Sequence, residues 1–575
     1  MKRTSVLTFA LFLMFVVQSA HAQRPNRHGK ISGDLANVKA SGTLDVIVQY
    51  KAAPKTPNYD RVASLGGVKK SKMHLIKAAA FKVPASALAE LAADPDVVYV
   101  SPDRPLHTTA DSSQTLDYYP LAVNAQVASG YGYDGTGIAV AVIDSGIIDI
   151  PDLHGQNYRV IFNQNFVGGT SGSANDVYGH GSHVAGIIGG NGNQSTGSNY
   201  FYTFKGIAPN VNLINLRVLD QNGVGTDSQV ISAIQMAVQL KNKYNIRVIN
   251  LSLGRPVHES YTVDPLCQAV EAAWKAGIVV VVAAGNYGRD NSVGEQGYGT
   301  ITAPGNDPYA ITVGAMRTMG TSSRADDLIA SYSSKGPTGI DHILKPDLVA
   351  PGNRMIALYT AGLTLSKLYP GNEIPYSLYQ TNGNSTSSST YYRLSGTSMA
   401  AAVVSGGVAD LLQAQPQLTP DQVKARLMKT AHKNFPYSSS TTDPSTGVMY
   451  TDYYDAFTVG AGYIDLQAAL NNTDVVPTGY TALSPAVSFN STTQTVNFIS
   501  DSSAVWGNSA VWGNSAVWGN SAVWGNSAVW GNSAVWGNSN NTGFSAVWGN
   551  SAVWGNSTVG SSSTEALSVA IDGEN

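Results

Sequence analysis

Four polar residues, widely spaced along the 575-residue chain, are of the types that carry out acyl transfer: Asp144, His180, Asn286 and Ser398. Such a reaction needs a nucleophile, a base that takes its proton, a carboxylate that holds the base in the right tautomer, and donors for the developing oxyanion. Serine, histidine, aspartate and asparagine can fill these places in that order. The chain must therefore fold so that the four side chains meet.

Ser398 lies in the sequence Gly396-Thr397-Ser398-Met399-Ala400 and opens an Ala/Val-rich run with no charged residue before Asp410. This pattern predicts a buried helix whose first turn presents a hydroxyl. The unpaired N–H groups and partial positive charge of a helix N-terminus would favour an oxyanion beside Ser398. A serine that only caps its helix is the ordinary alternative, and this run alone does not decide between the two.

The elements that must position these residues alternate between strands and helices from about residue 111 to 475. Apolar strand-like runs and helical runs follow one another at 137–143, 211–216, 227–244, 248–253, 264–276 and 277–283. The alternation predicts an α/β fold, a parallel sheet with helices on both faces. Ligands of such sheets lie at the carboxyl ends of the strands, where Asp144-Ser145-Gly146 and Ala284-Gly285-Asn286 are expected.

Three motifs stand out in this part of the chain: Val140-Ala141-Val142-Ile143-Asp144-Ser145-Gly146, Gly179-His180-Gly181-Ser182-His183-Val184-Ala185-Gly186, and Gly396-Thr397-Ser398-Met399-Ala400. All three resemble motifs of the subtilisin-like serine proteases. The order Asp, His, Ser is the order of the subtilisins. Val282-Ala283-Ala284-Gly285-Asn286 is a fourth match, and the resemblance covers about residues 111–475.

The resemblance implies a secreted serine endopeptidase with a subtilisin-like fold that needs no cofactor for catalysis and acts on protein or peptide substrates. Ser398 would be the nucleophile, and His180 the general base and then the general acid. Asp144 would orient and stabilise the imidazolium. Asn286 and the backbone N–H of Ser398 would bind the oxyanion.

The same resemblance implies three stretches of small residues around a bound peptide. Two of them would border an extended substrate: Gly223-Val224-Gly225 and Ser252-Leu253-Gly254. The third, Ala283, Ala284 and Gly285, would line a roomy and apolar first specificity pocket. Small residues let another backbone approach, which suits a peptide bound as an added strand. From the sequence alone, two ordinary glycine turns at 223–225 and 252–254 are an equal alternative.

Metal binding is left unassigned by the sequence. His183 follows His180 at a spacing that could ligate a metal, but carboxylate and cysteine ligands are missing nearby, so a structural histidine is expected. Asp152 falls at a position that contributes to a calcium site in the family. Its partners do not follow from the sequence, so we expect a solvated carboxylate and leave a structural calcium open. Residues 359–392 are expected to form an inserted surface loop near the cleft.

The first 110 residues read as two segments. Residues 1–22 have the basic start, the apolar run and the Ala20-His21-Ala22 cleavage site of a secretory signal peptide, which predicts export. No later run offers about 18 apolar residues, so we expect no membrane span. Residues 23–110 contain a small α/β pattern. The resemblance implies that this is an inhibitory propeptide, which lays its last residues through the cleft until self-cleavage between about Arg104 and Ser113.

Composition and the C-terminal region add little about chemistry. Charged residues make up 13% of the chain with a net charge of −3, which gives no basic field for nucleic acid. Cys267, the single cysteine, is expected in the core.

Residues 476–575 include Ala-Val-Trp-Gly-Asn-Ser repeats at 504–557 that predict a stacked β array or a disordered linker. Adhesion or carbohydrate binding is one hypothesis for this region, a structural role is another, and its partner is unassigned.

Two rival functions stay open from the sequence. A catalytically silent scaffold whose repeats bind a partner would keep the same fold. An esterase or lipase would use the same residue types, but the chain has no Gly-x-Ser-x-Gly motif.

Overall fold

The computed structural model describes residues 30–32, 35, 42–106, 116, 118–168, 172–291, 296–443, 446–474, 476, 481–490, 495–499 and 574. The predicted signal peptide, the part of the maturation region beyond residue 106 and the hexapeptide repeats lie outside these residues. We call residues 42–106 the N-terminal unit and residues 118–487 the main unit.

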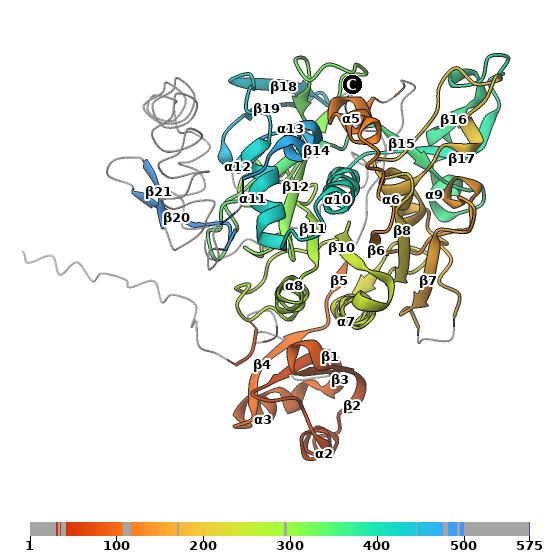
Figure 1. Cartoon of the computed structure of the whole chain (residues 1–575). Helices are drawn as coiled ribbons and strands as arrows, with labels where there is room; N and C mark the ends of the chain where they lie inside the picture. Colours follow the sequence, from red (N-terminus) through yellow and green to blue (C-terminus); the bar gives the residue numbers. More distant parts are fainter. Residues whose placement is uncertain are drawn as a thin grey trace, which may run out of the picture.

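The N-terminal unit is a four-stranded antiparallel sheet with helices on one face (Figure 1). Its elements are β1 (Thr43–Tyr50), α2 (Thr56–Ser64), β2 (Val68–Met73), β3 (Ala78–Pro84), α3 (Leu88–Ala93) and β4 (Val97–Pro102). The strand order is β2-β3-β1-β4. Side chains alternate between the two faces of each strand, so Val46 and Val48 pack under the helices while Ile47 joins the core of the main unit.

The main unit is built on an eight-stranded sheet. Its strands are β6 (Ala139–Asp144), β7 (Val160–Asn165), β8 (Asn212–Arg217), β10 (Ile246–Leu251), β11 (Val279–Ala283), β12 (Ile311–Arg317), β13 (Leu328–Ile329) and β14 (Leu348–Pro351). The order is β13-β12-β11-β10-β6-β8-β7, with β14 also paired to β12, and only β13 runs antiparallel to its neighbour among these described strands. The predicted α/β fold is confirmed. Continuous Val/Ile runs form the central strands because both faces are buried.

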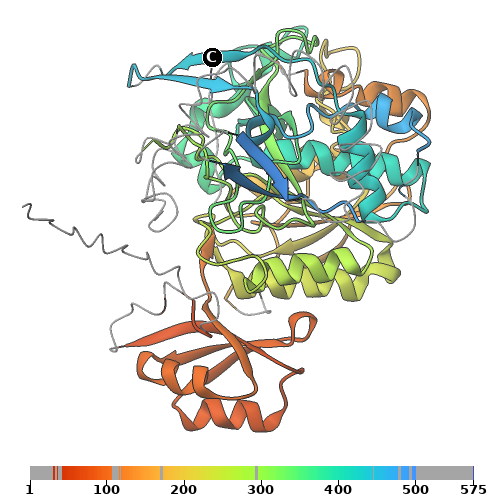
Figure 2. The ribbon, with the colours of Figure 1, turned by 90° about the vertical axis from the view of Figure 1, so that its left-hand side faces the viewer.

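Two pairs of long helices cover this sheet. They are α6 (His180–Gly189) with α10 (Thr397–Ala414), and α7 (Asp227–Tyr244) with α8 (Pro265–Lys275). Figures 1 and 2 show α7 and α8 on the side that faces the N-terminal unit, and α10 on the other. Cys267 is fully buried in α8, as expected. Among the described helices, none combines the length and the apolar character needed to cross a bilayer.

Shorter elements complete the main unit. These are α4 (Tyr119–Ala122), α5 (Ala125–Gly130), β9 (Gly225–Thr226), α11 (Pro420–Thr430), β18 (Ser438–Thr442), β19 (Met449–Tyr453), α12 (Ala456–Val459) and α13 (Leu466–Asn471). Single 3-10 turns lie at His74–Ile76, Ala85–Ala87, Pro151–Leu153, Asn193–Ser195, Pro370–Asn372 and Tyr376–Leu378. Two further pieces lie beside it, β5 (Pro105–Leu106) and the hairpin β20 (Ala486–Asn490) with β21 (Thr495–Ile499).

The expected surface loop at 359–392 contains a short helix and two strands of a small sheet. The strands β15 (Met355–Leu358), β16 (Glu373–Pro375) and β17 (Ser387–Leu394) pair antiparallel, with α9 (Thr364–Leu368) between the first two in sequence. Tyr359 and Tyr392 stack with ring centroids 4.8 Å apart, and Tyr391 lies 4.6 Å from Phe204. Buried aromatic pairs give this insertion a core, which the Tyr/Ser/Thr-rich composition did not indicate.

A buried cluster of charges joins the main sheet to the segment that follows residue 475. Asp347 accepts from Lys345 at 2.7 Å and lies 3.0 Å from the Lys424 ammonium, while the hydroxyl of Ser484 also donates to it. Burial would raise the pKa of Asp347, but the two lysines outweigh burial and hold this pKa below its usual value. Burial lowers the pKa of Lys424 to about 7.

Asp347→Ala should lower the free energy of unfolding by about 3–5 kcal/mol, because two buried ammonium groups lose their shared carboxylate. Denaturant unfolding of the full chain, followed by circular dichroism, measures this change. The matched control is Asp326→Ala, an exposed carboxylate that should change stability by less than about 0.5 kcal/mol. Equal midpoints for the two variants would contradict the expectation.

One residue from beyond the repeats, Glu574, contacts the buried part of the main unit. Its carboxylate lies 2.8 Å from the Arg289 guanidinium and 3.3 Å from that of Arg317. Its backbone N–H and C=O pair with the side chain of Asn353 at 3.1 and 3.0 Å. Two cations and an amide therefore hold this single residue by both its side chain and its backbone.

His183 ties α6 to the inserted sheet. Its Nε2 lies 3.1 Å from the carbonyl oxygen of Met355 and 3.0 Å from that of Tyr392, so the N–H is shared between two strands. The ring is fully buried. Burial, and next the neighbouring His180, lower the pKa of His183 to about 3.

This lowered pKa makes stability depend on pH with a definite sign. Above about pH 6.5 the imidazole is neutral in both the folded and the unfolded chain. Between about pH 6.5 and pH 3, the unfolded chain binds a proton at this imidazole that the folded chain does not bind. The contribution of His183 to the free energy of unfolding should therefore fall by about 1.4 kcal/mol for each pH unit of acidification. In His183→Gln, whose amide can still donate, the slope between pH 6 and 4 should be shallower by that amount. His74→Gln changes an exposed histidine and should keep the original slope, and identical slopes in all three proteins would refute the assignment.

Candidate active site

Asp144 and His180 meet at the carboxyl end of the central strand β6. Asp144 is the last residue of β6, and its Oδ1 lies 2.8 Å from Nδ1 of His180, the first residue of α6. Both side chains are fully buried, and Oδ1 also accepts from the N–H of Ser145 at 2.7 Å. A carboxylate on Nδ1 holds the proton there, so Nε2 is the nitrogen left to accept a proton.

A buried carboxylate that the sequence analysis gave no role, Asp176, holds the start of α6. Its oxygens accept from the backbone N–H groups of Gly179 at 2.8 Å and Ser182 at 2.9 Å, and from the hydroxyl of Ser145 at 2.9 Å. Burial raises the pKa of Asp176. An aspartate four residues ahead of the histidine, before a helix, was the available signal for this capping role.

The two turns approach so closely that glycine is required. A Cβ on Gly181 would lie 2.2 Å from the carbonyl oxygen of Gly146, and Gly146 has a φ of +112°. Ser145 completes the contact, because its hydroxyl accepts from the N–H of Gly181 at 2.9 Å. The glycines of both motifs thus allow His180 to reach Asp144.

Ser398 lies in the first turn of α10, which begins at Thr397 after Gly396 with a φ of +146°. Two bonds join it to the end of β10: the Ser398 hydroxyl donates to the carbonyl of Ser252 at 3.0 Å, and the Ser252 hydroxyl donates to the carbonyl of Ser398 at 2.8 Å. The Nε2 of His180 has no hydrogen-bond partner among the described residues. The bond between Ser398 and His180 is therefore not formed in this state, and the hydroxyl must leave Ser252 to make it.

Asn286 is held by the residue that precedes Ser398. Its Oδ1 accepts from both the backbone N–H and the hydroxyl of Thr397, each at 2.9 Å. The hydroxyl of Thr397 also accepts from the N–H of Gly285 at 3.1 Å. Because the carbonyl end of the amide is fixed on Thr397, its NH₂ end is oriented as a donor.

The three stretches expected around a peptide lie in two places. Gly225 belongs to β9, which pairs antiparallel with β5, and a Cβ on it would lie 2.5 Å from the carbonyl oxygen of Val218. The other two stretches both approach the side chain of Thr302. Its Oγ1 would lie 2.5 Å from a Cβ on Gly254, and its Cγ2 would lie 2.8 Å from a Cβ on Gly285. The remaining members of these stretches are Gly223, Val224, Ser252, Leu253, Ala283 and Ala284.

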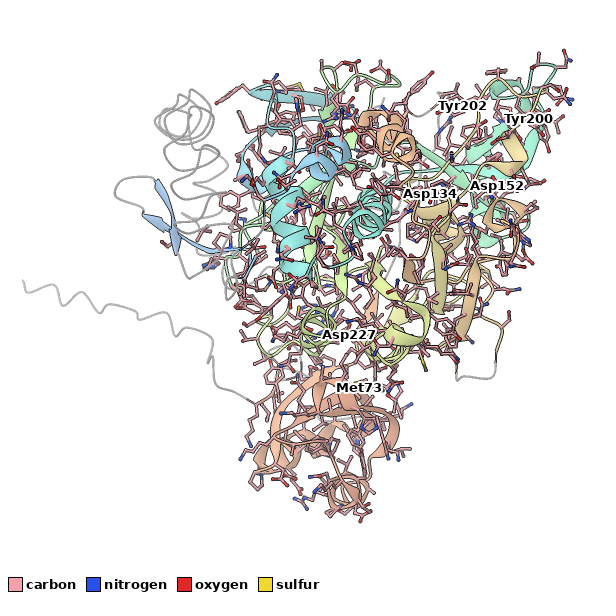
Figure 3. The ribbon with its side chains drawn as sticks, in the orientation of Figure 1. Met73, Asp134, Asp152, Tyr200, Tyr202 and Asp227 are labelled. Atoms are coloured by element: carbon pink, nitrogen blue, oxygen red, sulfur yellow. The ribbon has the colours of Figure 1, made fainter. Side chains whose placement is uncertain are left out.

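The expectation of a solvated Asp152 is wrong. This carboxylate, labelled in Figure 3, is fully buried. It accepts from the hydroxyl of Tyr391 at 2.6 Å and from the N–H of Gln194 at 2.7 Å. Burial raises the pKa of Asp152. Both oxygens face hydrogen-bond donors, so this arrangement does not fit a calcium ion, which needs several oxygen ligands. Within the described ranges, no three histidine, cysteine or acidic residues gather as a metal site would require.

Comparison with known proteins places the chain in a family. Residues 135–462 match the model of the subtilase family of peptidases. The chain is 36% identical to serine protease AprX of Bacillus subtilis over 374 residues, which is 63% of this chain and 76% of that protein. It is 30% identical to subtilisin E of Bacillus subtilis over 468 residues, 80% of this chain and 97% of that protein.

A solved structure shows a similar fold. The crystal structure of fervidolysin from Fervidobacterium pennivorans, a keratinolytic enzyme related to subtilisin, superposes with a TM-score of 0.56 at 22% identity. The match covers 79% of this chain and 64% of that one, less than two thirds of its length. The motifs, the sheet and these relatives lead to one conclusion: the chain belongs to the subtilase family of serine endopeptidases.

Proposed function

We propose that this protein is a secreted endopeptidase that hydrolyses peptide bonds through Asp144, His180 and Ser398 and is made as a self-processing proenzyme. The observation that carries the proposal is the 2.8 Å contact between Asp144 and His180, at the sheet edge where α10 presents Ser398. Export is supported by the pattern of residues 1–22 and would place the enzyme outside the cell or in a periplasm.

In the proposed reaction, the Ser398 hydroxyl leaves the Ser252 carbonyl and gives its proton to Nε2 of His180 as Oγ bonds to the scissile carbonyl carbon. The negative charge on the substrate oxygen accepts hydrogen bonds from Asn286 and from the Ser398 backbone N–H. Asp144 stabilises the imidazolium in a buried site, where charge interactions are strong.

The intermediate then breaks its C–N bond, and His180 returns the proton to the leaving amine. Water repeats the sequence on the acyl-enzyme, giving its proton to His180, and the acid is released with Ser398 restored. The steps need these side chains and a water, so no cofactor enters the proposed reaction.

Self-processing is supported by the position of the N-terminal unit. Its end continues into β5, which adds as a strand to β9 in the stretch expected to bind substrate. We propose that residues 23–110 are the inhibitory propeptide, that residues 111–475 carry the activity, and that residues 476–575, with their repeats, serve a separate role whose partner is unassigned.

A fluorophosphonate reagent should label the full chain once the N-terminal unit has been removed, because it bonds to an activated serine. Ser398→Ala should abolish labelling, and the matched change Ser232→Ala on α7 should retain it. Mass spectrometry of the labelled peptide identifies the serine. An unlabelled but folded protein would favour a catalytically silent scaffold instead.

Replacing Asn286 should mainly lower kcat. The expected loss for Asn286→Ala is about 10²–10³-fold, the range known for loss of this donor in a subtilisin, with little change in KM. Asn286→Asp keeps an oxygen that accepts from Thr397, but it replaces the NH₂ donor by a negatively charged oxygen that would repel the oxyanion. The loss of kcat in this variant should be at least as large as in Asn286→Ala. Steady-state hydrolysis of a peptide substrate measures both variants, with the exposed Asn434→Ala as control. A loss confined to KM would contradict the oxyanion role.

A further inference from the structure

The end of the N-terminal unit lies on the main unit as a bound peptide would. Pro105 and Leu106 pair antiparallel with Thr226 and Gly225. One residue earlier, the carbonyl of Arg104 accepts from the N–H of Asp227 at 2.9 Å. The backbone contact therefore extends from residue 104 to 106, which fixes where the Arg104 side chain must go.

That side chain enters a buried acidic pocket. Its Nη1 lies 2.7 Å from Oε1 of Glu259 and its Nη2 lies 3.0 Å from Oε2, a bidentate pair. Nη1 is also 3.9 Å from a carboxylate oxygen of Asp227, and only 4% of Arg104 is exposed. Asp227, the first residue of α7, is labelled in Figure 3 near the junction of the two units.

The main unit supplies more negative than positive charge at this pocket. Asp227 and Asp264 both pair with Arg255, at 2.9 and 2.8 Å. Glu259 is the third carboxylate, so one guanidinium of the main unit faces three acidic groups. Burial raises the pKa of Glu259, and Arg104 opposes this change.

The hydrogen bonds that Glu259 accepts within the described chain come from the N-terminal unit. The donors are Arg104 and the hydroxyl of Tyr99, the latter at 3.1 Å. When that unit leaves, the carboxylate loses both donors. Because Glu259 lies among more acidic than basic groups of the main unit, it would attract a cation on an incoming peptide.

We infer that Glu259 and Asp227 form a subsite for an arginine side chain of extended substrates, at the position directly before the two residues that pair with β9. The inference rests on the proposed function, because it treats β5 as occupying the place of substrate. Arginine is favoured over lysine because its planar fork matches both oxygens of Glu259, whereas an ammonium meets a carboxylate as a point charge.

The test uses the active form of the full chain and synthetic peptides that span residues 101–120. The parent peptide carries the natural arginine, and the others carry Arg104→Lys, Arg104→Gln or an exchange of Asp103 with Arg104. We expect kcat/KM to fall about tenfold for Arg104→Gln and for the exchanged peptide, and about threefold for Arg104→Lys. The exchanged peptide keeps composition and net charge, but it also moves Asp103, which accepts hydrogen bonds from the N–H and the hydroxyl of Ser228, so its loss reports the order of both residues.

Variants of the enzyme assign the effect to the pocket. In Glu259→Gln the ratio of rates for the parent and Arg104→Gln peptides should fall close to one. The matched control, Glu271→Gln, removes a carboxylate of α8 that pairs with Lys275 and should keep the tenfold ratio. The comparison of peptides on the unaltered enzyme stands even if a variant does not fold.

Failure of the inference and failure of the proposed function give different results. Equal rates for all four peptides, or a parent peptide that is neither cut nor inhibitory while a denatured protein is hydrolysed, would overturn the arginine subsite alone. An enzyme that hydrolyses neither peptides nor denatured protein after removal of the N-terminal unit would overturn the proposed function, and the inference with it.

Discussion

The first turn of α6 lies against the turn that ends β6, and the contact between Asp144 and His180 depends on this approach. The two chain segments touch at Gly181 and Gly146, where a Cβ would lie 2.2 Å from a carbonyl oxygen. Asp176 satisfies the N–H groups that the helix start leaves unpaired, and it does so in the interior, where unpaired groups are costly. The close approach of the two backbone segments and the buried cap Asp176 thus set the position of the His180 imidazole.

Several buried charges of the main unit are placed opposite specific partners of opposite charge. Arg255 spans Asp227 and Asp264, and Asp347 is shared by two lysines. Removing ions from water is expensive, so such groups are tolerated where pairing is nearly complete. They also join segments that are distant in sequence: Asp347 reaches Ser484, beyond the expected end of the family resemblance, and Glu259 reaches Arg104 in the other unit.

Local patterns in the sequence carried much of this structure. The apolar-rich runs that became β6, β8, β10 and β11 are visible because a strand buried on both faces is rich in apolar residues. The environment of Asp152 was not predictable, because its partner Tyr391 lies 239 residues away in an insertion whose composition suggested a loop. Nor does any local pattern indicate that Glu259 and Arg104 meet, since their contact depends on how two units dock. The periodicity of apolar residues indicates which face of a helix or strand is buried. It does not indicate which residue, distant in sequence, packs against that face.

The pairing of β5 with β9 is intramolecular, and this affects how a free peptide competes for the same site. A strand that is part of the same chain is present at its site at an effective concentration on the order of millimolar, whatever the amount of protein in solution. For a strand whose own dissociation constant is on the order of micromolar, this would raise the apparent dissociation constant of a competing free peptide about a thousandfold. Cutting the connection would make occupancy of β9 follow ordinary mass action, so that dilution could separate the two pieces.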